Sequence, residues 1–136
     1  LTYIATASPQ VMARFFAEGV DARSLQRAPM LRFDRRDQLQ ARWAHEALGL
    51  RISPPTHWTP ATHGMLDMVL AGLGWAMTPL GLAEPHLSAG RLVEMTPHRR
   101  IAIPLYWQRT RLSAQLLEHL TRAVRKIAAE TLTPVN

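Results

Sequence analysis

The chain has 136 residues, 47% of them hydrophobic, which is enough to bury the core of one compact domain. It contains no cysteine, which excludes disulfides, thiolate metal ligands and cysteine nucleophiles and suits a cytoplasmic protein. The formal net charge is +6, but the basic residues are almost all arginine and are spread along the chain, so the charge does not predict a nucleic-acid-binding face.

The first predicted elements are a strand and a helix. Thr2–Ser8 alternates β-branched and aromatic residues with small ones, which is typical of a strand. Ser8 and Pro9 predict a helix start, because serine caps helix N-termini and proline is tolerated at the first helical position; Gly19 ends this helix. The strand pattern begins at once, with no initiator Met or secretory leader, so we expect a piece of a larger protein, and no apolar run is long enough to span a bilayer.

Four further elements follow. Asp21–Arg27 predicts a short helical turn and Met30–Phe33 a second strand. A charged break, Asp34–Asp37, precedes a helix that ends near Gly49. The apolar residues of that helix recur at helical spacing: Leu39, Trp43, Ala47 and Leu50. The next stretch is rich in proline, so that only Thr56–Thr59 fits a strand.

The stretch Val69–Pro79 contains a Gly-x-Gly between a helix and a strand. Thr62 is expected to cap the helix, which is apolar around much of its circumference and therefore largely buried. A dinucleotide-binding loop needs the opposite order, a strand before the glycines and a helix after them. Gly72 is therefore expected to be a left-handed residue at the helix C-terminus, and Gly74 to allow a tight turn into the strand Trp75–Pro79.

The last third continues the alternation of helices and strands. Leu80–Ser88 predicts a capped helical turn, Arg91–Met95 a strand, and Ile101–Arg109 a longer strand in which Pro104 indicates an edge or a bend. Ser113 is expected to cap a long amphipathic helix. Its apolar positions are Leu116, Leu117, Leu120, Val124, Ile127 and Ala128. The whole pattern predicts an α/β layered domain with a mostly parallel sheet.

Five stretches occur in a fixed order: "LTYIATASP", "LQRAPMLRFDRRDQLQ", "PTHWTP", "AGLGWAMTP" with "AGRLVEM", and "PLYWQR". Together they resemble the effector-binding domain of LysR-type transcriptional regulators over nearly the whole chain. The second, third and fifth resemble one branch in particular, the lysine- and arginine-responsive regulators, also known as chromosome replication initiation inhibitors.

The resemblance implies a periplasmic-binding-protein-like fold of type II, a three-layer αβα arrangement in which two hinged subdomains enclose a small effector. Residues 1–102 are expected to form the second effector subdomain, 103–132 the returning strand and C-terminal helix that belong to the first subdomain, and 133–136 a tail. The family's N-terminal winged helix-turn-helix and the first half of the effector domain do not occur in this sequence. We therefore expect the C-terminal helix to pack against its own subdomain or a second chain.

Four residues are candidates for effector contact from their positions at strand ends. Ser8 stands at a helix N-terminus, where a hydroxyl and backbone amides suit a carboxylate, or it is a plain N-cap. Asp34, Arg35 and Asp37 crowd the turn after the second strand, at the edge where open α/β sheets bind ligands. A carboxylate there suits the ammonium or guanidinium of a basic amino acid. The alternative is a solvated Asp34, and for Asp37 a helix cap, which propensity favours.

The extended segment before the buried helix holds two more candidates. The resemblance implies that this junction faces the effector, with Trp58 as an apolar wall or Thr59 as a hydroxyl donor. For Trp58 a structural role is the better single expectation. His57 and His63 lie six residues apart with no third ligand at suitable spacing, which predicts no metal site.

Two hypotheses of different class remain. The first is the effector-binding part of a regulator that responds to a basic amino acid such as lysine or arginine. Such a chain needs no cofactor, contacts DNA only through the missing helix-turn-helix, acts as a homo-oligomer and does not contact a membrane. The second is a solute-binding protein or a small α/β enzyme of similar architecture, although no nucleophile-elbow pattern supports catalysis. With one wall of the cleft missing, we expect weak or undetectable effector binding by this chain.

Overall fold

The computed structural model describes residues 1–108 and 117–132 in two compact units. One unit is Tyr3–Ile101, and the other combines Leu1–Thr2 with Ala102–Asn136. The elements in chain order are β1 (Thr2–Ala7), α1 (Pro9–Phe15), α2 (Ala22–Arg27), β2 (Met30–Arg32), α3 (Leu39–Leu48), β3 (Thr56–Trp58), α4 (Thr62–Leu70), β4 (Ala76–Pro79), α5 (Leu80–Ser88), β5 (Val93–Glu94), β6 (Ile101–Ala102) and α6 (Glu118–Thr131).

Strand β1 runs opposite to β4 and β5. It pairs antiparallel with β4, where Tyr3 lies opposite Pro79, and antiparallel with β5; β6 also pairs with β1. Strands β2 and β3 pair in parallel, and a parallel bridge between Met30 and Trp75 joins them to the start of β4. The expected mostly parallel sheet is therefore correct for β2, β3 and β4 and wrong for β1. Alternation within a strand encodes which face is buried, not the direction in which the strand runs.

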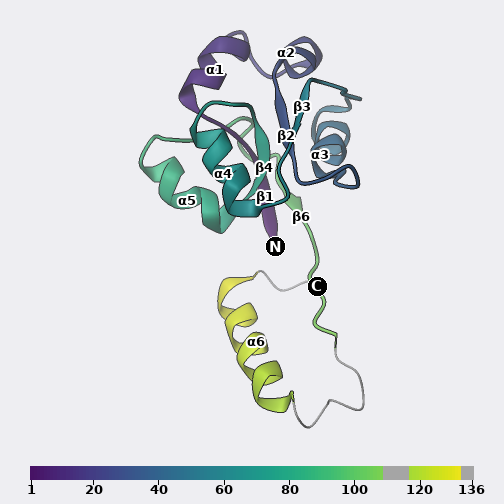
Figure 1. Cartoon of the computed structure of the whole chain (residues 1–136), viewed down its shortest axis with the longest axis vertical. Coiled ribbons are helices and arrows are strands. Elements are labelled where there is room, and N and C mark those ends of the chain that lie inside the picture. Colours follow the sequence, from purple (N-terminus) through teal and green to yellow (C-terminus); the bar gives the residue numbers. More distant parts are fainter. Residues whose placement is uncertain (109–116, 133–136) are drawn as a thin grey trace. The chain divides into compact units, whose positions relative to one another are not determined.

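Helices cover both faces of the sheet (Figure 1), which confirms the expected three layers. Helices α4 and α5 pack over one face in a continuous core: Ile4, Leu31, Met65, Leu66, Val69, Ala76, Ala83 and Leu92. On the other face α3 contributes Trp43, whose ring centroid lies 5.4 Å from that of Trp75. Both indoles are fully buried, and the Trp43 Nε1 donates a hydrogen bond to the Arg99 carbonyl at 2.8 Å.

The Gly-x-Gly ends a helix and enters a strand, as its order predicted. Gly72 follows α4 with φ +78°, in the left-handed region that favours glycine. Gly74 was expected to allow a tight turn, but its φ does not lie in the left-handed region, so glycine is required there for another reason. A Cβ at this position would lie 2.4 Å from the Pro29 carbonyl oxygen, so the side chain is excluded by the close approach of the β2 entry.

The helix ends agree in part with those predicted from the sequence. Ser8 caps α1 by accepting a hydrogen bond from the Val11 amide at 3.3 Å, and Gly49 ends α3 with φ +68°. Thr62, expected to be a cap, is instead the first residue of α4, whose N-cap is Ala61 without a side-chain cap bond. The expected cap of α5 is likewise wrong, because Pro79 holds the N-cap position and has no side chain able to accept a bond.

The second unit contains Ala102, the last residue of β6, and helix α6. The expected long strand is wrong beyond Ala102, since residues 103–108 form no regular element, while Ser113 and Leu116 lie outside the described residues. The Leu1 ammonium donates to the Ile103 carbonyl at 2.8 Å. Helix α6 buries Thr121 and exposes much of Leu120 and Ile127. What covers this apolar face stays a prediction. Within the described residues, no helix has both the length and the apolarity to cross a bilayer.

Candidate functional site

Several segments meet at one edge of the Tyr3–Ile101 unit. Strands β2, β3 and β4 end there because they run in the same direction, and β1 begins there because Tyr3 pairs with Pro79. A cavity of about 270 Å³ opens at this edge, and we call it the edge cavity. Its lining residues are Tyr3, Phe33, Asp37, Leu39, Gln40, Thr62, Met65, Met77 and Pro79. The carboxyl edge of parallel strands is where α/β sheets bind their ligands.

The turn between β2 and α3 places its two carboxylates differently. The Asp34 Oδ1 accepts hydrogen bonds from the Arg36 amide at 2.7 Å and the Asp37 amide at 2.9 Å. The Asp37 carboxylate accepts from the Phe33 amide at 3.0 Å and from the Leu39 amide at 3.0 Å. Asp34 is exposed and shapes the turn, whereas Asp37 is half-buried and reaches the edge cavity. The expectation that Asp37 caps α3 is wrong, because Gln38 is the N-cap residue and makes no side-chain cap bond; the Asp37 carboxylate instead bonds the amide of Leu39, the first residue of the helix.

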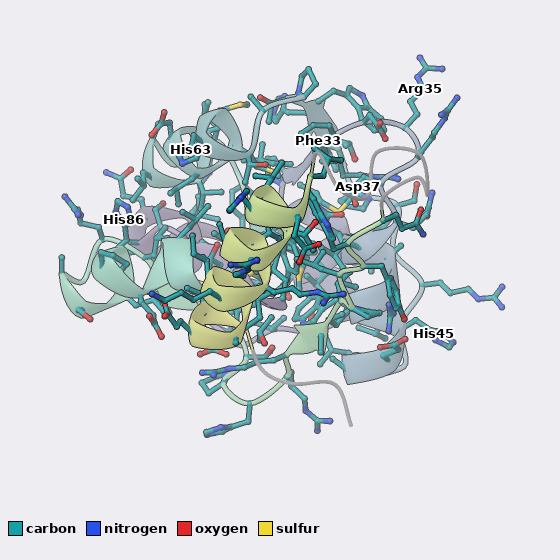
Figure 2. The ribbon with its side chains drawn as sticks, turned by 90° about the horizontal axis from the view of Figure 1, so that it is seen from below. Phe33, Arg35, Asp37, His45, His63 and His86 are labelled. Carbon is teal, nitrogen blue, oxygen red and sulfur yellow. The ribbon has the colours of Figure 1, made fainter. Side chains whose placement is uncertain are left out.

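Arg35, in this turn, and Arg32, the last residue of β2, lie in different surroundings. Figure 2 shows Arg35 extending outward from the turn. Phe33 and Asp37 instead both line the edge cavity. The Arg32 guanidinium instead folds back: it donates to the main-chain carbonyls of Arg35 and Asp37, and it lies 5.1 Å from the centroid of the Trp58 ring. Arg32 was not among the predicted residues, because its alternate position in a strand suggests only a solvent-facing side chain.

Two polar side chains of the edge cavity were also missed by the sequence reasoning. Tyr3 enters from β1, and burial first and the Asp37 charge second raise the pKa of its hydroxyl above the ordinary value. Gln40 is 1% exposed, and its Nε2 donates to the Leu31 carbonyl at 2.8 Å. One signal was present in the sequence: Gln40 begins the inward stripe of α3 that continues with Trp43 and Ala44.

Trp58 and Thr59 lie beside the edge cavity and do not line it. Trp58 is 47% exposed, so the expected structural role is not that of a core tryptophan; its ring instead packs against the Arg32 guanidinium. The Thr59 amide donates to the Arg32 carbonyl at 2.9 Å and continues the β2 to β3 ladder. These two residues therefore hold the end of β2 from which Phe33 enters the cavity.

Ser8 is remote from the other candidates because β1 is antiparallel. It follows the last residue of β1, whereas Tyr3 is the second residue of that strand, so most of the length of β1 separates the two residues. Ser8 is 3% exposed and contributes to a second cavity, of about 370 Å³, together with Gln10 and Arg91. Ser8 therefore lies apart from the acidic turn, and its hydroxyl makes the helix-cap bond that was one of its two expected roles.

The histidines are dispersed. Figure 2 shows His45, His63 and His86 on separate parts of the molecule. Within residues 1–108 and 117–132, no three His, Asp or Glu side chains come together in a way that could hold a metal ion. Among the described residues that line the edge cavity, Asp37 is the one with a charged side chain.

Comparison with known proteins gives consistent results. The LysR substrate binding domain family matches residues 2–129. The HTH-type transcriptional regulator ArgP of Pseudomonas fluorescens is 37% identical over 134 residues, which are 98% of this chain and 44% of that protein. The chain thus spans less than half of the length of this relative, which is named as a transcriptional regulator.

Solved structures also match nearly the whole chain. The C-terminal domains of a LysR family protein from Agrobacterium tumefaciens are 50% identical with a TM-score of 0.96, covering 99% of this chain and 65% of that one. Full-length LysG from Corynebacterium glutamicum with bound effector Arg is 32% identical with a TM-score of 0.82, covering 98% of this chain and 45% of that one. These matches confirm the expected fold class.

Proposed function

This chain belongs to the LysR substrate-binding domain family, and we propose that it forms one wall of the effector cleft in a transcriptional regulator that senses a basic amino acid. The observation that carries the proposal is the match to arginine-bound LysG over 98% of this chain. The edge cavity supports it independently, because it offers one carboxylate among largely apolar walls at the edge where this architecture binds ligands.

Within this proposal, Asp37 is the counter-charge for the effector. Its carboxylate is held by the Phe33 and Leu39 amides, so it is oriented before the ligand arrives. Asp34 acts indirectly by fixing the turn, and Trp58 and Thr59 hold the neighbouring strand end. An oriented carboxylate loses little conformational entropy on binding, which favours affinity.

The regulator would contain this chain as part of a larger, cytoplasmic homo-oligomer that contacts DNA through a separate helix-turn-helix domain. The effector shifts the regulator between arrangements only to the extent that it binds one of them more tightly. A closed cleft supplies contacts from two walls, so the free energy of the switch depends on both. This is why the isolated 136-residue chain is expected to bind arginine or lysine weakly or undetectably.

Calorimetry on the longer regulator tests the proposal. Arginine or lysine should bind it, while leucine and glutamate should not. Asp37→Asn should weaken the binding of the basic amino acid about tenfold, the cost of losing a charge-assisted hydrogen bond. Asp67→Asn is the matched control, because Asp67 is an exposed carboxylate on α4 that does not line the edge cavity. Absence of binding by either basic amino acid, or equal binding of the neutral and acidic ones, would show that the proposal is wrong.

A further inference from the structure

Gln40 lines the edge cavity and carries an unmet hydrogen-bond acceptor. The side chain is 1% exposed, and its Oε1 is buried without a partner among the residues that the structure describes. The orientation of the amide is fixed, because the Leu31 carbonyl only accepts and must face the Nε2, which donates to it at 2.8 Å. The oxygen is therefore the atom left over. Buried acceptors are nearly always paired, so this one calls for a donor from outside the chain.

The surroundings of this oxygen suit one kind of donor. Phe33, Met65 and Met77 supply apolar and aromatic walls, and the Asp37 carboxylate supplies the charge. A guanidinium is planar, presents five N–H donors, stacks on aromatic faces and is weakly hydrated. An ammonium is a compact, strongly hydrated charge with three donors, and it loses more hydration in such a cavity. Two separate acceptors among apolar walls therefore match the guanidinium better.

We infer that Gln40 is a specificity-determining residue that selects arginine over lysine by accepting a hydrogen bond from the guanidinium through its Oε1. This inference rests on the proposed function and adds the ligand's chemistry to it. Asp37 attracts any basic amino acid, while Gln40 distinguishes between the two. Tyr3 is a further polar residue that lines the cavity, from the β1 side.

The first test needs no substitution. Calorimetry on the unaltered longer regulator should give an affinity for arginine at least about tenfold higher than for lysine, the discrimination typical of one charge-assisted hydrogen bond. Lysine binding as tightly as arginine overturns the inference while leaving the proposed function intact. Absence of binding by both overturns the proposed function itself.

The second test is Gln40→Met, which keeps an unbranched side chain of similar length and removes the acceptor. We expect arginine affinity to fall about tenfold and lysine affinity to fall less, so that the ratio of the two narrows. Gln38→Met is the matched control, because Gln38 is exposed two residues earlier and its side chain makes no cap bond to α3. An equal loss for both ligands, or an unchanged ratio, means that Gln40 only supports the fold and overturns the inference.

Discussion

Replacing Gly74 by alanine tests the close approach between the entry of β2 and the entry of β4. A Cβ at residue 74 would lie 2.4 Å from the Pro29 carbonyl oxygen and 3.0 Å from the Pro29 carbonyl carbon. Both are backbone atoms, so no side-chain rotation relieves the overlap. The two segments must separate, although they are joined by the Trp75 amide donating to the Pro29 carbonyl at 3.0 Å and the Leu31 amide donating to the Trp75 carbonyl at 2.9 Å.

The magnitude follows from these contacts. Overpacking a rigid site costs about 1–3 kcal/mol, and each hydrogen bond lengthened or lost adds about 1 kcal/mol. We expect Gly74→Ala to lower the free energy of unfolding by about 3 kcal/mol. Because the adjacent Trp75 ring is fully buried against Trp43, the displacement also disturbs the core on the α3 face.

Urea denaturation followed by tryptophan fluorescence measures this change. Gly81→Ala is the matched control, because Gly81 lies in α5 and its added Cβ would meet nothing within 4 Å. In a helix, alanine is favoured over glycine by about 0.5–1 kcal/mol, so the control should be stabilised. If Gly74→Ala unfolds within about 0.5 kcal/mol of the unaltered chain, the close approach of the two strand entries is not what requires glycine.

Three further predictions concern buried or titrating side chains. Trp43→Ala should lower the unfolding free energy by about 3–5 kcal/mol in the same urea assay, and a loss below 1 kcal/mol would contradict its burial against Trp75. The pKa of Tyr3 is raised above 10.0, so its contribution to the free energy of unfolding is present below that pH and is lost as pH rises through the folded-state pKa. Tyr3→Phe should therefore flatten the alkaline limb of a plot of melting temperature against pH. The pKa of Asp21 is lowered by hydrogen bonds from Ser24, so its contribution to the free energy of unfolding is present above pH 3.8 and is lost as pH falls through the folded-state pKa. Asparagine is also a good N-cap, so Asp21→Asn should flatten the acid limb of the same plot and leave the melting temperature at neutral pH nearly unchanged.

Features decided within a few residues could be predicted from the sequence. Gly49 and Gly72 end helices in the left-handed region, as the apolar periodicity before each glycine indicates. Ser8 caps α1, and the residues around Asp21 form the short helix expected of them. In each case the controlling hydrogen bond or dihedral angle lies inside one turn of chain, so the local pattern contains the information.

Features decided by a partner far along the chain could not be predicted from the sequence. The direction of β1 depends on its pairing with β4, some 70 residues away, and that direction moved Ser8 to the opposite end of the sheet from Asp37. Gly74 was assigned to a turn because the sequence cannot show that the Pro29 carbonyl approaches it. The same limit applies to the exposure of Trp58, because its half-exposed ring packs against Arg32 of the neighbouring strand.

The acidic turn shows how the two kinds of information combine at the candidate site. Its sequence places two carboxylates three residues apart and favours Asp34 as the ligand group, because propensity assigns Asp37 to a helix cap. The structure separates them, because Asp34 lies exposed and satisfies amides of its own turn, while Asp37 faces the cavity that Tyr3 and Gln40 complete from β1 and α3. The carboxylate that bonds the first amide of α3 is therefore also the one that faces the cavity. A hydrogen bond between a carboxylate and the start of a helix does not argue against a binding role, because such a bond holds the charge in place.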